Sequence, residues 1–203
     1  MSFISMLCFF LSFHLTGQTK DSGFSSLSSP EKWWVVWHPF KAKKALTVSL
    51  RTLEVTDSIK KAGSIGIDMN GGKLDAFKHT FWMANMSQHI GQKASLKLGR
   101  AHEKGNYRSF LQGRPEDGVL PDKVSSDMDL FNNEAGAQLA NNHPKTSEYE
   151  LILITIEKLQ QGGLKTIKKD QNVFLTCEGV PISEASLIGK WENDKCLIPS
   201  NDP

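Results

Sequence analysis

The residues most able to do chemistry fall in three short segments of this sequence. They are 75–85, 102–103 and 129–133, and each holds carboxylate, imidazole or carboxamide side chains. In the first segment, DAFKHTFWMAN, Asp75 and His79 are four residues apart and would share one face of a helix. We therefore expect three helices to bring hydrogen-bonding and metal-ligating groups to one polar site.

Each candidate receives a role from its chemistry. An imidazole exchanges protons near neutral pH, so His79 is the candidate general base and Asp129 the carboxylate that orients it. Glu103 is the third catalytic candidate. The substrate-binding candidates are Asp75, Lys78, Asn85, Asn132 and Asn133. Each residue also has a structural interpretation, as a helix cap, a core histidine or an amide that holds a loop, but their clustering favours a site.

The sequence leaves open a divalent metal, either zinc or calcium. His102 could converge on zinc together with His79 and Asp129, although no local H-E-x-x-H spacing is present. Glu103 would then act as the base. The Gly-rich loop DMNGGKLD (68–75) offers oxygen ligands for calcium, but it lacks the EF-hand pattern. A serine nucleophile is not indicated, because no G-x-S-x-G motif occurs.

The motifs D-A-F-K-H, A-H-E and M-D-L-F-N-N-E-A-G together resemble those of a bacterial domain of unknown function. Its members show D-A-[FL]-[RK]-H, then A-H-E and M-D-L-x-N-N-x-x-G, in exported proteins and at the ends of toxin-like proteins. The resemblance covers residues 66–142 and implies a helical fold with a shared polar site, without supplying a reaction. Lys78 stands where arginine is commoner, which weakens a bidentate contact to phosphate or carboxylate.

Hydrophobic periodicity predicts a mainly α fold, with a compact helical domain at 33–161 and a short β-rich appendage at 162–203. Gly136 would let another backbone or a substrate approach closely. The expected helices are 41–62, 75–90, 92–104, 128–142 and 147–161. A further helix precedes them, and we expect its tryptophans to anchor it to the core rather than to form a membrane-surface patch. These are Trp33, Trp34 and Trp37.

The N-terminus has the composition of a secretory signal. Residues 1–17 carry no Lys, Arg, Asp or Glu, and their apolar run is shorter than the ~20 residues of a membrane-spanning helix. We expect cleavage after Gly17, with 18–32 as a linker; an uncleaved anchor and an internal core segment are the alternatives. Export would leave Cys177 and Cys196 as a pair, which favours a disulfide between them.

These features restrict the function without fixing it. A net charge of +2 indicates no nucleic-acid partner, and no transmembrane helix is expected after signal cleavage. The sequence predicts a secreted or periplasmic, cell-envelope protein that acts on an unknown envelope component or small substrate. It would be a hydrolase of lipid or peptidoglycan with a His/Asp/Asn site. The alternative is a non-catalytic secreted or envelope binding protein whose polar cluster is structural.

Overall fold

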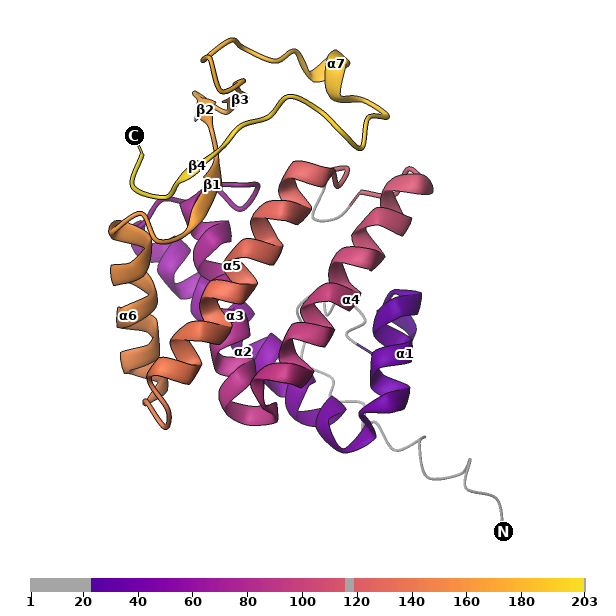
Figure 1. Cartoon of the computed structure of the whole chain (residues 1–203), viewed down its shortest axis with the longest axis vertical. Helices are drawn as coiled ribbons and strands as arrows, with labels where there is room; N and C mark the ends of the chain where they lie inside the picture. Colours follow the sequence, from indigo (N-terminus) through magenta and orange to yellow (C-terminus); the bar gives the residue numbers. More distant parts are fainter. Residues whose placement is uncertain (1–22, 116–118, 203) are drawn as a thin grey trace.

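The structure, a computed structural model, describes residues 23–115 and 119–202, and it is a helical bundle with a small β region at one end (Figure 1). The expected signal peptide and the first five residues of the expected linker, 18–22, lie outside the described residues. The helices are α1 (Ser29–Trp37), α2 (Pro39–Ala62), α3 (Lys73–Ile90), α4 (Gln92–Leu111), α5 (Lys123–Asn142), α6 (Glu148–Gln160) and the short α7 (Glu184–Leu187). This arrangement confirms the predicted mainly α fold class.

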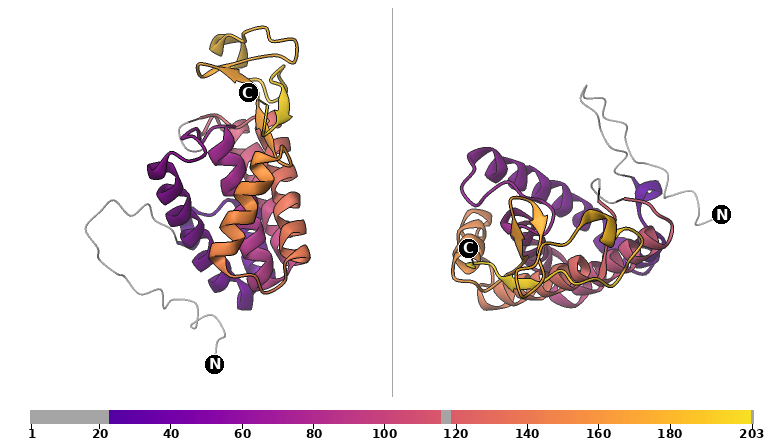
Figure 2. Two further views of the ribbon diagram at one scale, coloured as in Figure 1. Left: turned by 90° about the vertical axis from the view of Figure 1, so that its left-hand side faces the viewer. Right: turned by 90° about the horizontal axis from the view of Figure 1, so that it is seen from above.

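The C-terminal region contains two small antiparallel sheets. In the first, β1 (Lys165–Ile167) pairs with β4 (Leu197–Pro199), and in the second β2 (Lys169–Asp170) pairs with β3 (Val173–Phe174). The predicted disulfide is present and joins Cys177 to Cys196, with a Cα–Cα distance of 4.9 Å. The region covers one end of the bundle (Figure 2) and contacts α5 and α3 through β1.

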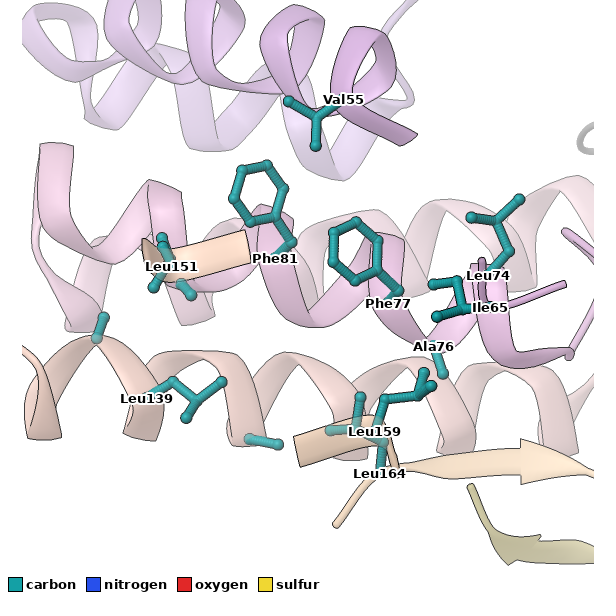
Figure 3. Packing of buried hydrophobic residues seen from close by; sticks show 13 residues of the cluster. Val55, Ile65, Leu74, Ala76, Phe77, Phe81, Leu139, Leu151, Leu159 and Leu164 are labelled. Atoms are coloured by element: carbon teal, nitrogen blue, oxygen red, sulfur yellow. The ribbon is translucent and has the colours of Figure 1, made fainter. Parts of the chain in front are cut away.

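Helix α3 is the centre of the bundle, because α2, α4, α5 and α6 all pack against it. Its residues Phe77 and Phe81 are fully buried one turn apart, and their rings stack with centroids 5.6 Å apart. Leucines from α6 and from the segment after it complete this core (Figure 3). Since α3 is buried on nearly every side, its polar residues Asp75 and His79 are buried as well.

Helices α3 and α5 approach most closely at Gly136, as the sequence predicts for this glycine. A Cβ atom at Gly136 would lie 2.1 Å from the backbone carbonyl oxygen of Thr80. Backbone atoms cannot move aside as the end of a side chain can, so this crossing requires glycine.

Three helix boundaries differ from the sequence prediction, and packing or capping explains each. Helix α1 begins at Ser29, inside the segment expected to be a linker, where Ser28 N donates to Glu31 Oε2 at 2.8 Å. Helix α4 was expected to end before Gly105, but it continues through this glycine to Leu111. A Cβ at Gly105 would lie 2.5 Å from Ser28 Oγ, so this glycine serves close packing of α1 on α4.

Helix α5 begins five residues earlier than the predicted 128–142. Asp122 caps it, accepting a hydrogen bond from Ser125 N at 2.8 Å. The other oxygen of the same carboxylate receives Lys195 Nζ at 2.5 Å in a buried ion pair. The capping residue therefore also ties the C-terminal region to the bundle, which the local sequence pattern could not show.

The expectation that all three tryptophans of α1 anchor it to the core is wrong for two of them. Trp34 is buried, and its Nε1 donates to the carbonyl of Ala94 at 3.0 Å. Trp33 and Trp37 are 62% and 75% exposed. Helix α1 packs on α4 through one face, and these two residues lie one turn apart on another face.

No helix within residues 23–115 or 119–202 combines the length and the hydropathy that a bilayer crossing requires.

The crossing at Gly136 predicts a large effect for a small substitution. Gly136→Ala should destabilise the protein by about 1–3 kcal/mol or more, because the added methyl group overpacks against backbone. Gly99→Ala is the matched control, since its methyl would meet the ends of the Met83 and Asn133 side chains rather than backbone. Urea denaturation of the two variants compares them directly, and equal stability would contradict a helix crossing that depends on Gly136.

Candidate functional site

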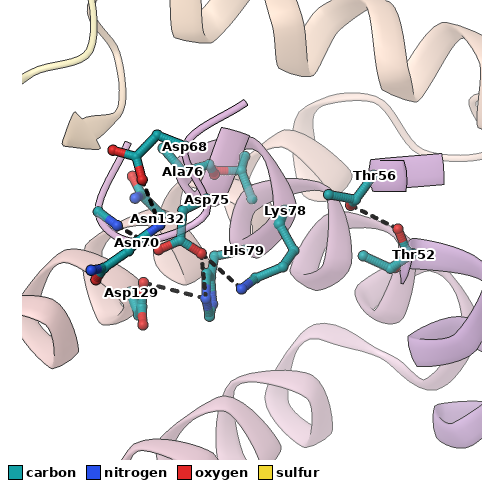
Figure 4. A network of polar contacts seen from close by, with 12 residues as sticks. Thr52, Thr56, Asp68, Asn70, Asp75, Ala76, Lys78, His79, Asp129 and Asn132 are labelled. Carbon is teal, nitrogen blue, oxygen red and sulfur yellow. Dashed lines mark hydrogen bonds and ion pairs between the residues drawn. The ribbon is translucent and has the colours of Figure 1, made fainter. Parts of the chain in front are cut away.

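The site is built on the first turns of α3 and on the facing turns of α5. His79 Nε2 lies 3.5 Å from Asp75 Oδ1 and 3.3 Å from Asp129 Oδ1 (Figure 4). All three side chains are buried. The structure therefore brings together the predicted base, its predicted orienting carboxylate and one residue that the sequence analysis placed among the substrate-binding candidates.

Asp75 is held in place from two sides. Its Oδ2 accepts a hydrogen bond from Gly71 N at 2.9 Å, which fixes the Gly-rich loop against the start of α3. Its Oδ1 faces His79 and receives Lys78 Nζ at 2.7 Å. The structural and functional interpretations of Asp75 are thus not exclusive, because one oxygen supports the loop while the other belongs to the cluster.

Asn133 lies close enough to the imidazole of His79 to influence its charge. Its amide favours the protonated ring and so acts to raise the pKa of His79. Neither Nδ1 nor the side-chain atoms of Asn133 form a hydrogen bond of normal geometry with a described residue, although all are buried. A hydrogen bond from Nδ1–H to Asn133 Oδ1 would satisfy both buried groups and leave the Nε2 lone pair facing the two carboxylates.

Helix α4 contributes His102 and Glu103, but it directs them to different partners. His102 Nδ1 is 3.0 Å from Glu31 Oε1, which joins α4 to α1. Glu103 is buried, and its Oε2 accepts hydrogen bonds from Ser126 Oγ at 2.7 Å and Asn106 Nδ2 at 3.2 Å. His102 thus lies outside the cluster of His79 and the two aspartates.

Two of the predicted substrate-binding residues take other positions. Asn132 bonds both backbone groups of Lys165 at 2.9 Å, so its amide extends the pairing of β1. Asn85 is buried on α3, and neither residue is among those that line the cavity described next.

A cavity of about 810 Å³ opens in front of the cluster, and Asp75, His79 and Asp129 form part of its wall. Most of the remaining wall is apolar and comes from α1, α2, α3, α4 and the segment before α5. The apolar lining includes Trp34, Leu46, Met69, Trp82, Leu98 and Leu120. Lys78, His102 and Glu31 line the same polar part of the wall. A mostly apolar pocket with a few convergent polar groups is typical of a ligand-binding site.

Burial shapes the charge state of the cluster. Burial, together with the positive charges of Lys78 and His102, lowers the pKa of His79 well below its usual value. Burial also raises the pKa of Asp129 well above its usual value, and the negative charges of Asp75 and Glu103 act in the same direction. The cluster therefore favours a neutral imidazole with a free lone pair.

Asp75, His79 and Asp129 could together hold a metal ion, because one ligand atom from each lies within 4.8 Å of the others. Donors at 2.0–2.1 Å from a tetrahedral zinc are separated by roughly 3.3 Å. The observed distances of 3.3 and 3.5 Å from His79 Nε2 to the two carboxylate oxygens match this separation. The sequence analysis had considered His102 as a ligand, whereas the third residue of this group is Asp75.

Sequence reasoning missed several residues around the cavity. Ser126 is one helical turn before Asp129, and the i, i+3 spacing is a signal that could have found it. Glu31 carries no such signal, because it reaches His102 only through the packing of α1 on α4.

A mainly helical domain with a buried Asp–His–Asp cluster at an apolar cavity is the class of protein that the fold and the site define. The chain belongs to the family described as Domain of unknown function (DUF6973), whose model matches residues 32–163. This confirms the resemblance to a domain of unknown function, and the match includes α2 to α6 and all of the cluster. No curated protein and no solved structure matches the chain.

The contact between Glu31 and His102 predicts a pH dependence of stability. Burial opposes ionisation of Glu31, but hydrogen bonds and charge from His102, with help from Ser28, lower its pKa from 4.5 to about 2. A folded-state pKa below the unfolded value adds stability above pH 4.5, which is lost as the pH falls towards 2. A shift of this size corresponds to about 3 kcal/mol.

Glu31→Gln should therefore flatten the decline of unfolding free energy between pH 4.5 and 2. Glutamine can still accept the backbone hydrogen bond at the start of α1. Urea denaturation across this range measures the effect, with Glu134→Gln on the exposed face of α5 as a control. A variant that loses stability with pH as steeply as the native chain would show that the contact does not contribute.

Proposed function

We propose that this protein is a metal-dependent hydrolase that acts on an amphiphilic lipid ester or phosphoester. The observation that carries the proposal is the position of Asp75, His79 and Asp129 on the wall of a large, mostly apolar cavity. The proposed metal ligands are His79 Nε2, Asp75 Oδ1 and Asp129 Oδ1.

The composition of the cluster supports a cation there. Asp129 Oδ1 and Asp75 Oδ1 are buried without a conventional hydrogen-bond donor among the described residues, apart from the ion pair with Lys78 and the approach of His79. Two carboxylates and an imidazole suit zinc or manganese better than calcium, which prefers oxygen ligands alone. Three protein ligands also leave a position open to substrate, as in catalytic zinc sites.

The cavity favours a lipid over peptidoglycan as the substrate. An apolar wall of this extent gains free energy by covering an acyl chain, whereas a glycan strand would lose hydrogen bonds to water there. The polar groups are confined to one part of the wall, so an ester or phosphate would lie at the cluster while the chain lies along α2 and α4.

The residues divide the work as follows. A divalent cation in the cluster would polarise a carbonyl or phosphoryl oxygen as a Lewis acid. Asn133 would hold His79 Nδ1–H, so that Nε2 remains a ligand. Lys78 Nζ, at the polar wall, would attract an anionic headgroup or developing negative charge. The apolar wall would exclude bulk water from the reacting bond.

A non-catalytic lipid-binding protein is the second candidate, and a specific observation favours it. Lys78 already pairs with Asp75 at 2.7 Å, and burial raises the pKa of Asp129, which favours its uncharged form. The cluster could therefore be compensated without a metal, and the cavity would then only hold an amphiphile.

The proposed setting is the cell envelope or the extracellular space. It is supported by the signal-like composition of residues 1–17 and by the Cys177–Cys196 disulfide, which persists in oxidising compartments. A role at the end of a toxin-like protein, which the motif resemblance suggests, would place the same hydrolase at the envelope of a competing cell.

Metal binding is the first test. Zinc or manganese should raise the thermal midpoint, with about 2.7 kcal/mol of added stability at a metal concentration 100 times Kd. His79→Gln and Asp129→Asn should abolish the rise. His102→Gln, a change of a second imidazole on the same cavity wall, should retain it. A rise that persists in His79→Gln, or no rise in the native chain, would contradict the site.

Hydrolysis is the second test. The metal-loaded protein should cleave p-nitrophenyl esters of long acyl chains in preference to those of short chains. Leu46→Trp should fill the cavity and lower the rate for long chains by at least about tenfold while sparing short ones. Binding of long-chain esters without any turnover would favour the second candidate over the hydrolase.

A further inference from the structure

We propose that the turn between α1 and α2 docks onto an anionic lipid bilayer, with the cavity mouth facing the membrane. The docking surface, called the aromatic rim, consists of Trp33, Val36, Trp37 and Phe40. It lies at the end of the bundle opposite to the C-terminal β region (Figure 1). The direction of substrate entry rests on the proposed function, whereas the docking itself stands on the surface alone.

The aromatic rim consists of four exposed apolar residues within eight positions of the chain, 33–40. Trp33, Val36 and Trp37 follow helical spacing along one face of α1, and Phe40 comes one turn later at the start of α2. Phe40 is 95% exposed, the highest value among the large hydrophobic residues of the described chain. Tryptophan and phenylalanine on a surface helix are typical of groups that insert into the headgroup region of a membrane.

The stretch of chain that carries the rim has positive charges only. From Lys32 to Leu53 the chain contains no aspartate or glutamate. Lys43 and Lys44 are exposed one turn beyond Phe40, so they can approach lipid phosphates while the aromatic rings enter the interface. Each basic residue near an anionic bilayer raises the partition coefficient of the protein by about tenfold or less.

The rim borders the cavity. Val36, Pro39 and Lys43 are exposed and also line the cavity, so the cavity reaches the surface beside the α1–α2 turn. Phe24 and Leu53, both exposed, also line the cavity. A lipid leaving a bilayer against this rim would enter the cavity with its chain first and without crossing water.

A bilayer fits this surface better than a second copy of the chain. A two-fold contact through the rim would place the lysines of both copies against each other with no acidic residue nearby to pair with them. An anionic membrane supplies both the apolar interior for the rings and the negative charge for the lysines.

Vesicle co-sedimentation of the full-length chain tests the proposal. The native chain should partition at least about tenfold more strongly onto phosphatidylglycerol-containing vesicles than onto pure phosphatidylcholine vesicles. Trp37→Ser/Phe40→Ser should reduce binding to anionic vesicles at least about tenfold, since two large apolar side chains no longer insert. Lys43→Glu/Lys44→Glu should remove the preference for anionic lipid.

Matched controls share the exposure but not the location. Tyr149 and Ile188 are 70% and 77% exposed on other parts of the surface, and Tyr149→Ser/Ile188→Ser should bind as the native chain does. Lys60→Glu/Lys61→Glu, at the other end of α2, is the charge control. Equal loss of vesicle binding in the control and rim variants, or retained binding in the rim variants, would overturn the proposal. It would also be overturned if the only effect of the rim variants were the loss of a dimer, as measured by sedimentation velocity.

Separate experiments can refute the hydrolase proposal and the membrane-docking proposal. His79→Gln should bind vesicles normally whether or not the chain is a hydrolase. Trp37→Ser/Phe40→Ser should cleave a monomeric long-chain ester at the native rate but lose activity on vesicle lipid by at least about tenfold. Unchanged vesicle activity in this variant would refute the membrane surface while leaving the hydrolase intact.

Discussion

The close contact of α3 and α5 at Gly136 is the constraint on which the site depends. Gly136 lies two turns from Asp129 along α5, and its partner Thr80 is next to His79 on α3. The absence of a side chain at residue 136 lets the two backbones meet, and this short separation brings Asp129 Oδ1 to 3.3 Å from His79 Nε2. Helices held farther apart by side chains would leave the imidazole and this carboxylate without contact.

The same burial that packs α3 makes its charged groups costly. Two carboxylates and an imidazole on a poorly hydrated wall need compensation by a proton, a neighbouring cation or a metal. Lys78 provides a neighbouring cation, the raised pKa of Asp129 favours a proton there, and the geometry of the three ligand atoms suits a metal. A metal that replaced the proton and the lysine would convert this buried, charge-compensated cluster into a Lewis-acid site.

The cavity connects the cluster to the end of the bundle that carries the aromatic rim. The Asp–His–Asp cluster lies on α3 and α5, while α1 and α2 supply most of the apolar lining and carry exposed aromatic and basic side chains beside the cavity. The C-terminal region covers the other end, where the Lys195–Asp122 ion pair ties it to the start of α5 and the disulfide joins two of its own segments. One end of the bundle is thus covered by a disulfide-linked region held by a buried ion pair, and the other presents a surface suited to a lipid interface.

Much of the fold was readable from the sequence, because local signals determine it. Apolar periodicity, the Ser147 cap and Gly63 and Gly91 as stops gave the helices α2, α3 and α6 to within a few residues. The cysteine pair predicted its own disulfide. The clustering of polar residues in 75–85, 102–103 and 129–133 included Asp75, His79 and Asp129, which do meet, as well as His102, which does not join them. These signals suffice because i, i+4 spacing and capping act within a few residues of chain.

Only the tertiary structure decided the rest, since it depends on contacts between distant segments. Glycine often ends a helix, so the sequence predicts a stop at Gly105. In the structure Gly105 lies inside α4, where its lack of a side chain leaves room for Ser28. Asn132 lies in a polar motif and was expected to bind substrate, but its side chain forms two hydrogen bonds with the backbone of Lys165. The three tryptophans of α1 are alike in sequence, yet one is buried and two face outward, because packing on α4 covers only one face of that helix. Sequence thus determines which side chains can meet along a helix, and the packing of helices determines which of them do.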